Sequence, residues 1–375
     1  MSNKLDKYYT DQILTYMGNK RKFVKKREHI IRYIEDEENK PEKSLKIAEG
    51  FSGSGILSRL FKNNSSFFHV NDLAGYSKTL NLCYLSNPTQ VDRNYINGII
   101  DKANDFVDNS NERYEKFVSK HWSFSETCKN KKEKRLYYSY ENALRIDKYM
   151  HFIKSVHKSH RHYLLAPLLV QCSIHNNTNG QFSAFYKDAV GVGKLGGKKE
   201  VDIKRIAGKI RLPYPLFSSN KSGKKVYQMD TNEWVKTINE VDIMYFDPPY
   251  NKHPYNIYYF LLDIINNWDT DIEIPDTNRG QPKNWKKSEY NSIRKAKEVF
   301  TNLIKNTKAK WIILSYNDGG IVPISEIDHI LKGRGEVQKI PIDYLVYNKL
   351  KGIAAYKRKG ENKKVREFLW IVKTK

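Results

Sequence analysis

The sequence predicts an α/β fold in which a doubly wound, Rossmann-like sheet is interrupted by a mostly helical insertion. Short apolar runs alternate with amphipathic stretches at both ends of the chain, and this alternation is typical of open α/β sheets. The middle of the chain is charged and aromatic with a helical period, and no strand alternates with it. We therefore expect a first core part at 1–100, an insertion at 101–225 and a second core part at 226–375.

The first core part contains a strand, a loop and a helix in succession. The run "KSLKIAE" predicts a short strand, and "ILSRLFKN" predicts a helix with its apolar residues on one face. Between them lies the Gly/Ser turn "GFSGSG", Gly50 to Gly55. A second apolar run, "SSFFHVND", ends at Asp72 and matches the second strand of a nucleotide-binding unit.

The second core part supplies the remaining strands. "KKVYQMD" ends at Asp230 and "VDIMYFD" ends at Asp247. Three later apolar runs, "AKWIILSYND", "IPIDYLVYN" and "REFLWIVKT", predict three more strands. Acidic residues thus recur where predicted strands end, and open α/β sheets bind ligands at that edge.

The charge balance indicates a polyanionic partner. The chain has 66 Lys and Arg against 42 Asp and Glu, a net charge of +24, which favours nucleic acid, although a basic composition bias is an alternative. Residues 181–225 hold 11 basic and 3 acidic residues together with several glycines, as expected of a loop that lies against phosphates. The basic residues expected to hold DNA there are Lys187, Lys194, Lys198, Lys199, Lys204 and Arg205.

Composition also argues against other classes of protein. No run approaches the roughly 20 apolar residues of a membrane span, and the N-terminus has no apolar core like a secretory signal. The three cysteines and the histidines show no metal-ligand spacing. We expect a DNA-associated protein of the bacterial cytosol, with no membrane contact and no metal.

The Gly/Ser turn predicts a nucleoside-type cofactor. Glycines let the backbone approach a ligand closely at a helix start. The turn lacks both the Gly-Lys-Ser/Thr of a phosphate loop and the GxGxxG of a dinucleotide site, which favours S-adenosylmethionine. Glu49 is placed to hold the cofactor's amine and Asp72 to accept from ribose hydroxyls. Asp72 and Asp230 have an alternative interpretation as helix caps.

The run "DPPYN", Asp247 to Asn251, predicts chemistry on an amine. Two prolines fix φ and donate no amide hydrogen, so the Asp247 carboxylate and the Pro248 carbonyl are held rigidly at a strand end. Two such acceptors suit the two hydrogens of an exocyclic adenine amine, which they make more nucleophilic. Tyr250 would stack on the base after it leaves the duplex.

In chain order, "YMGNKRKF", "FSGSG" and "DPPYN" resemble the Dam-type, alpha-group N6-adenine-specific DNA methyltransferases of restriction-modification systems. The resemblance implies a methyltransferase sheet that binds S-adenosylmethionine. It implies that Tyr16 and Lys20 reach the cofactor's carboxylate and that Asp230 binds its adenine amine. It also implies that Phe51, Ser52 and Gly53 line the methionine part and that Asp72 takes the ribose.

The resemblance assigns target recognition to the insertion. "NNTNGQFSAFYK", with Asn179, resembles the family's base-contacting hairpin, and "LSYNDGG" implies that Ser315, Tyr316 and Asn317 lie near the target base. Double-stranded DNA is the implied partner, and a separate restriction endonuclease or a second methyltransferase is left open. Two alternatives also stay open: an RNA adenine methyltransferase, and a DNA-binding protein without catalysis on a methyltransferase scaffold.

Overall fold

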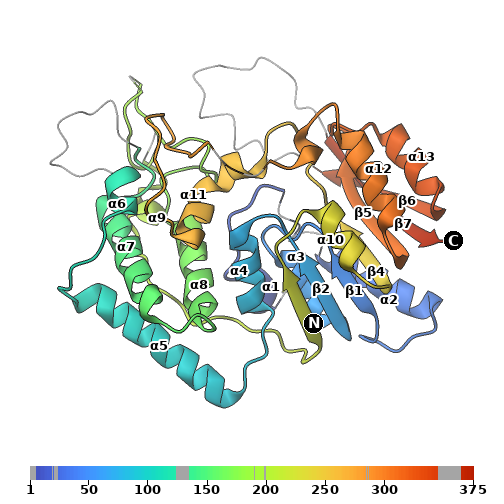
Figure 1. Ribbon diagram of the computed structural model, residues 1–375, viewed down its shortest axis with the longest axis horizontal. Helices are drawn as coiled ribbons and strands as arrows, with labels where there is room; N and C mark the ends of the chain where they lie inside the picture. The colour runs from blue at the N-terminus through green and yellow to red at the C-terminus, as the bar shows by residue number, and fades with distance from the viewer. Residues whose placement is uncertain are drawn as a thin grey trace.

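A seven-stranded sheet in the order β3-β2-β1-β4-β5-β7-β6 forms the centre of one half of the molecule (Figure 1). The computed structural model describes residues 6–18, 20, 24–123, 135–189, 191–197, 200–283, 285, 287–344 and 365–375. The strands are β1 (Lys46–Glu49), β2 (Phe67–Asn71), β3 (Gly223–Tyr227), β4 (Val241–Phe246), β5 (Ala309–Asn317), β6 (Gly335–Tyr344) and β7 (Val365–Thr374). Five strands pair in parallel, and β7 pairs antiparallel with both β5 and β6.

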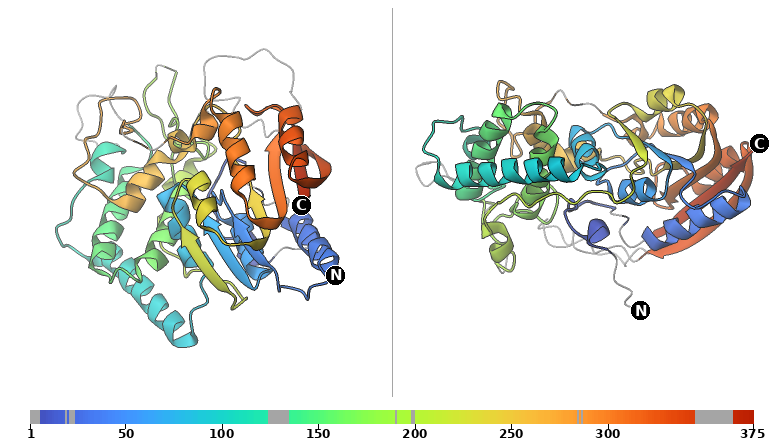
Figure 2. Two further views of the ribbon diagram at one scale, coloured as in Figure 1. Left: turned by 45° about the vertical axis from the view of Figure 1, so that its right-hand side comes forward. Right: turned by 90° about the horizontal axis from the view of Figure 1, so that it is seen from below.

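Helices cover both faces of this sheet, and β4 shows why. All six of its residues are buried; Ile243 and Tyr245 pack with α2 (Val24–Glu37) and α3 (Ile56–Asn63). Met244 and Phe246 pack on the opposite face with α10 (Thr231–Thr237), α12 (Ala296–Asn306) and α13 (Ile324–Lys332). Successive strand residues point to opposite faces, so a continuous apolar run suits a strand buried on both sides. Figure 2 shows these layers edge-on.

The predicted doubly wound α/β fold is confirmed, with each of the seven expected strands present. The sixth strand begins at Gly335, earlier than expected, and the end of "IPIDYLVYN" lies outside the described residues. The short helices α1 (Lys7–Thr10) and η3 (Glu289–Asn291) complete this half. None of the helices in the described ranges is long and apolar enough to cross a membrane.

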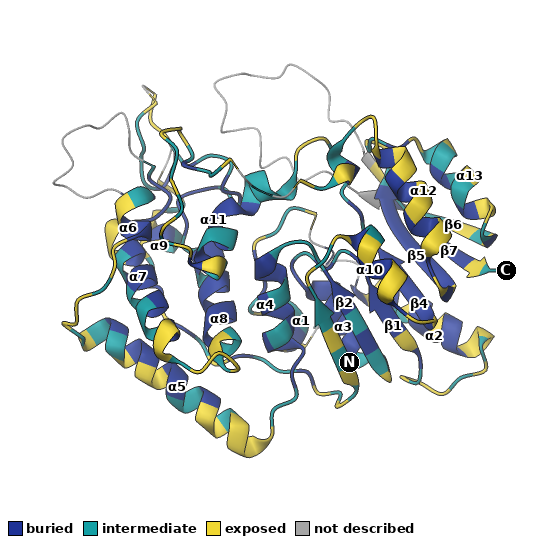
Figure 3. Cartoon of the chain, in the orientation of Figure 1, coloured by how far each residue is buried: buried dark blue, intermediate teal, exposed yellow. Residues whose placement is uncertain are grey.

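A helical region lies beside the sheet, and its helices occur between β2 and β3 in the chain (Figure 1). These helices are α5 (Gln90–Asn109), α6 (Val118–His121), α7 (Tyr140–Ser155), α8 (Arg161–Ile174) and α9 (Ile203–Ala207). Apolar residues of α5, α6, α7 and α8 share one core with α4 (Gly75–Tyr84) and α11 (Tyr255–Asn267). Helix α5 begins before residue 101, and the three-segment division stays a prediction. The outer face of α5 is exposed, whereas most of α8 is buried (Figure 3).

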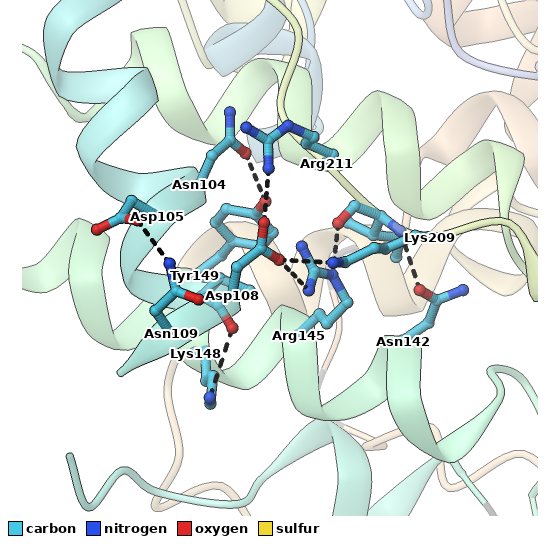
Figure 4. A network of polar contacts seen from close by, with 12 residues as sticks. Asn104, Asp105, Asp108, Asn109, Asn142, Arg145, Lys148, Tyr149, Lys209 and Arg211 are labelled. Carbon is cyan, nitrogen blue, oxygen red and sulfur yellow. Dashed lines mark hydrogen bonds and ion pairs between the residues drawn. The ribbon is translucent and has the colours of Figure 1, made fainter. Parts of the chain in front are cut away.

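A charged network ties this helical region together (Figure 4). Asp108 of α5 contacts Arg145 of α7 at 2.7 Å, and it contacts Lys209 at 2.9 Å and Arg211 at 2.6 Å. Burial alone would raise the pKa of Asp108, but the hydrogen bonds from Lys209 and Arg145 outweigh burial and lower it to about 2. Asp108 therefore joins two helices to the segment after α9 through three cations.

Candidate active site at the carboxyl ends of the strands

A cavity of about 540 Å³, here called the central cavity, opens at the carboxyl ends of β1, β2 and β4. It is lined by all nine residues predicted to bind the cofactor: Tyr16, Lys20, Glu49, Phe51, Ser52, Gly53, Asp72, Asp230 and Asp247. These residues lie far apart in the sequence and meet because parallel strands end at one edge of the sheet. Their binding of a cofactor stays a prediction, but their convergence is observed.

The Gly/Ser turn forms the floor of this cavity. The Gly50 amide donates to the Tyr245 carbonyl at 3.0 Å, which joins the start of the turn to β4. Gly53 has a φ of +51°, and a Cβ there would lie 3.0 Å from the Tyr16 ring. A side chain at this position would meet both backbone strain and the ring. The turn therefore needs glycine where the backbone borders the cavity.

Glu49, at the end of β1, places a buried carboxyl group in the cavity wall. It is only 1% exposed, and its Oε2 accepts a hydrogen bond from Ser58 Oγ at 2.5 Å. Burial raises the pKa of Glu49 to about 8. A ligand cation would restore its charge, because an opposite charge nearby favours the carboxylate.

Asp72 and Asp230 both line the cavity and also hold the backbone. Asp72 accepts from the amides of Gly53 at 2.7 Å and Ala74 at 2.9 Å. Asp230 caps α10 and accepts from the Asn232 amide at 2.9 Å. The capping interpretation therefore describes Asp230, and Asp72 braces the turn before α4. Neither contact removes these carboxylates from the cavity wall.

Tyr16 stands among aromatic rings from α11. Its ring stacks on Tyr259 at 4.5 Å between centroids and on Tyr255 at 5.4 Å. The Met17 amide donates to the Tyr259 hydroxyl at 2.6 Å. These contacts fix the N-terminal segment, with the Tyr16 ring beside Gly53. The Ser52 hydroxyl instead contacts Ser77 Oγ, at 2.9 Å, and so anchors the turn to α4.

Asp247 lies directly after β4, beside the Lys20 ammonium. The Lys20 Nζ is 3.4 Å from Asp247 Oδ1 and 2.7 Å from Glu367 Oε1 of β7. Burial raises the pKa of Asp247, and Lys20 only partly opposes this rise. The resemblance implied that Lys20 reaches the cofactor's carboxylate, whereas the structure shows its ammonium between two protein carboxylates.

Pro248 and Tyr250 do not line the central cavity, although Pro249 does. The Tyr250 ring lies edge-on to the Tyr316 ring, with centroids 6.3 Å apart. The backbone carbonyl of Tyr250 accepts a hydrogen bond from the Ile321 amide at 2.8 Å. These contacts hold the "DPPY" segment against the loop after β5. The predicted roles of Pro248 and Tyr250 toward the base stay predictions.

A second cavity of about 740 Å³ adjoins the central one, with which it shares Gln281, Pro282 and Trp285. Its wall joins residues 183–187 of the expected recognition segment to residues 277–287, which follow α11. It is basic, with Lys187, Arg279, Lys283 and Lys287 in its lining. The sequence interpretation assigned Lys187 to DNA but missed Arg279, Lys283 and Lys287.

The other predicted DNA contacts lie in varied surroundings. Lys204 is exposed on α9, Asn179 is partly buried, and Lys194 pairs with Glu200 at 3.1 Å. Arg205 donates to the carbonyls of Asn176 at 2.8 Å and Thr178 at 2.9 Å, so its guanidinium braces a turn. Residues 198 and 199, the predicted Lys198 and Lys199, lie outside the described residues.

Two acidic groups near the site were not anticipated. Asp263 of α11 lines the central cavity, and burial raises its pKa to about 7. Glu367 of β7 contacts Lys20; a glutamate inside the apolar run "REFLWIVKT" was the available signal. Ser315, which the resemblance placed near the base, is fully buried and donates to Glu367 at 2.7 Å. No group of His, Cys, Asp and Glu residues within the described ranges could hold a metal.

Comparison with known proteins adds a family match. The family model described as D12 class N6 adenine-specific DNA methyltransferase matches residues 16–317. This match includes the Gly/Ser turn, "DPPY" and the whole helical region, and it ends before β6 and β7.

The chain is also similar to curated type II methyltransferases. It is 28% identical over 302 residues to M.NlaIII of Neisseria lactamica, covering 78% of this chain and 81% of the relative. It is 26% identical to M.FokI of Planomicrobium okeanokoites, covering 90% of this chain and 50% of the relative. The modification methylase StsI of Streptococcus sanguinis is 31% identical over 57% of this chain and 30% of its own length.

Proposed function

The chain belongs to the D12 class N6 adenine-specific DNA methyltransferases, and from this premise we propose which ligand each of its two cavities binds. The central cavity binds S-adenosylmethionine, and Asp247 presents the N6 amine of a flipped adenine to it. The observation that carries this proposal is the convergence of the nine predicted residues, Asp247 among them, on one cavity. The family resemblance predicted from the sequence is confirmed by the match over residues 16–317.

The residues present fit this cofactor. The cavity volume of about 540 Å³ is that of a small-molecule site. A Cβ on Gly53 would come within 3.0 Å of the Tyr16 ring, so glycine lets the turn and Tyr16 lie side by side in the cavity wall. Glu49 offers a buried carboxyl to the cofactor's ammonium, and Asp72 and Asp230 offer acceptors to its ribose and adenine. When bound, S-adenosylmethionine supplies an electrophilic methyl group on a sulfonium sulfur.

Asp247 orients the acceptor amine and receives its proton. The Asp247 carboxylate and the Pro248 carbonyl accept the two amine hydrogens, and this draws the nitrogen toward a pyramidal, nucleophilic form. N6 must lose one proton when it gains the methyl group. Because burial raises the pKa of Asp247, its carboxylate takes that proton more readily than an exposed aspartate would.

The second cavity supports a path for DNA toward this site. Its basic residues come from both the recognition segment and residues 277–287, and phosphates favour such a cationic rim. Gln281, Pro282 and Trp285 border both cavities. A base that leaves the duplex over the second cavity would pass these three residues and enter the central cavity beside Asp247.

The biological role follows from the relatives. M.NlaIII and M.FokI are named type II methyltransferases, and StsI is named a modification methylase. We propose that this chain is likewise the modification enzyme of a restriction-modification system and acts on cytosolic DNA, with a restriction endonuclease or a second methyltransferase as its partner. The family description favours DNA over the RNA alternative.

The test is expression in a host that lacks adenine methylation, followed by sequencing that detects modified adenine. One short motif methylated throughout the genome is expected, and Asp247→Ala should leave no modified adenine. Binding of S-adenosylmethionine to the purified protein is measured in parallel by calorimetry. Cofactor binding without modified DNA would overturn the DNA assignment, and absence of cofactor binding would overturn the assignment of the central cavity.

A further inference from the structure

Glu367 is a buried carboxylate near the start of β7. Its backbone pairs with Asn317 of β5 and Ile342 of β6, and its side chain is 10% exposed. Such a charge is unfavourable in a sheet interior unless other groups compensate it. The segment that matches the family model ends at residue 317, so this residue lies outside it.

Three groups from separate parts of the chain converge on one oxygen of Glu367. Its Oε1 accepts from Lys20 Nζ at 2.7 Å and from Ser315 Oγ at 2.7 Å. Arg27 of α2 approaches the same atom at 3.5 Å. Asp247 completes the group, since Lys20 also lies 3.4 Å from it. Two cations thus face two carboxylates, and the shared member is Lys20.

The two distances to Lys20 differ in a way that matters for Asp247. Lys20 makes a full hydrogen bond to Glu367 and only a longer ion pair to Asp247. An ammonium that bonded Asp247 directly would occupy a carboxylate oxygen that an amine hydrogen needs. It would also hold Asp247 ionised more strongly and make it a poorer proton acceptor.

We propose that Glu367 is a positioning residue for methyl transfer, which draws the Lys20 ammonium away from Asp247 and so keeps an Asp247 oxygen open for the adenine amine. The inference rests on the proposed function for the identity of that amine. Ser315 supports the arrangement by fixing the Glu367 carboxylate, and it acts without touching the base.

The decisive variant is Glu367→Gln, which keeps the shape and removes the charge. Lys20 then closes on Asp247, so we expect kcat to fall by about tenfold or more while KM for cofactor and for DNA stays within about twofold. The acidic limb of the kcat profile should move to lower pH, because a closer ammonium lowers the pKa of Asp247. A rise in KM with unchanged kcat would overturn the proposal.

A double-mutant cycle separates positioning from folding. In a Lys20→Met background no ammonium is left to draw away, so Glu367→Gln should change kcat by less than about twofold there. Equal losses in both backgrounds would contradict the proposal. The matched control is Asp147→Asn in α7, another buried carboxylate, which accepts from Ser119 Oγ at 2.6 Å; it should alter stability and leave kcat unchanged.

Two further measurements keep the test open if Glu367→Gln does not fold. Ser315→Ala loosens the same carboxylate and should lower kcat by a few fold with the same direction of pH shift. The pKa of Asp247 is read by ¹³C NMR of labelled aspartate, assigned with Asp247→Asn, and should fall in either variant. An unchanged Asp247 pKa would refute the inference even if the protein methylated no DNA. Absence of methylation by the wild-type chain would instead refute the proposed function.

Discussion

Two aspartates in this molecule have opposite environments. The contrast distinguishes a carboxylate that stabilises the fold from one that is available to a substrate. Asp108, in the helical region, is held by three cations within 2.9 Å, and its pKa is about 2. Asp247, in the central cavity, has Lys20 at 3.4 Å, and burial raises its pKa. Asp108 has its hydrogen-bonding capacity filled by the protein, whereas Asp247 keeps acceptor capacity for a substrate.

The basic residues also fall into two groups, those paired with a carboxylate and those without such a pairing in the described part of the chain. Lys209 and Arg211 belong to the basic stretch 181–225, yet Asp108 holds both of them. Lys283 borders the second cavity, and no carboxylate in the described part of the chain lies within ion-pair distance of it. Charge count alone therefore overstates how many cations are available to phosphates.

The largest test of the comparison is Asp247→Asn. The amide keeps the shape but cannot accept the amine proton, so methyl transfer should fall by about 10³-fold or more. The free energy of unfolding should change by less than about 1 kcal/mol, since a carboxylate whose hydrogen-bonding capacity is not filled by the protein adds little to stability. A filter assay for labelled methyl groups and chemical denaturation give the two values. Equal loss of folding and transfer would mean that Asp247 is structural.

Glu49 extends the comparison, because a hydroxyl from Ser58 is its side-chain partner. Its pKa of about 8 in the free protein means that binding of a cofactor cation releases a proton below pH 8. Affinity for S-adenosylmethionine should therefore increase by about tenfold per pH unit as pH rises from 6 toward 7.5. Calorimetry at pH 6.5 in buffers of different ionisation enthalpy measures the proton released. Glu49→Gln should bind weakly with no proton release, and a proton count unchanged by this variant would exclude Glu49.

Asp108→Asn should act on stability and not on turnover. Removal of the charge leaves three cations without their shared partner, and we expect a loss of about 2 kcal/mol in the free energy of unfolding. Because the pKa of Asp108 is lowered in the folded state, its contribution is present above about pH 4 and is lost as pH falls toward 2. Wild type and variant should therefore converge in acid. A change in kcat per folded molecule would contradict the division between the two aspartates.

The smallest expected effect compares two lysines. Lys283→Gln should weaken DNA binding a few fold and flatten the slope of log K against log salt by about one, as for one lost phosphate contact. Lys209→Gln, which changes a lysine held by Asp108, should leave that slope unchanged. Fluorescence anisotropy at several salt concentrations measures both. Equal slopes for the two variants would show that pairing with Asp108 does not withhold Lys209 from DNA.

The sequence predicts the strand ends well because the apolar runs and the loop motifs that follow them are both local features of the sequence. Apolar runs mark the strands, and "DPPY" and "GFSGSG" follow them directly, so parallel pairing alone brings these loops to one edge. The contacts of Lys20, Arg205 and Glu367 were not predictable in this way. Lys20 and Glu367 are partners 347 residues apart, and Arg205 contacts Asn176, 29 residues away. The residues next to a side chain in sequence do not specify such a distant partner. The cations of 277–287 were missed because that stretch follows no strand.

The position of β7 bears on how the chain becomes active during its synthesis. β7 follows β6 in the chain but lies between β5 and β6 in the sheet, so the ribosome must release both strands before β7 can enter its place. Until then Glu367 does not contact Lys20, and Lys20 has Asp247 as its nearby carboxylate. If Glu367 positions Lys20 as proposed, a nascent chain in which β7 has not yet paired presents adenine poorly even when its cofactor loops are folded. On that proposal, methylation has to wait until β7 has been translated and has paired between β5 and β6.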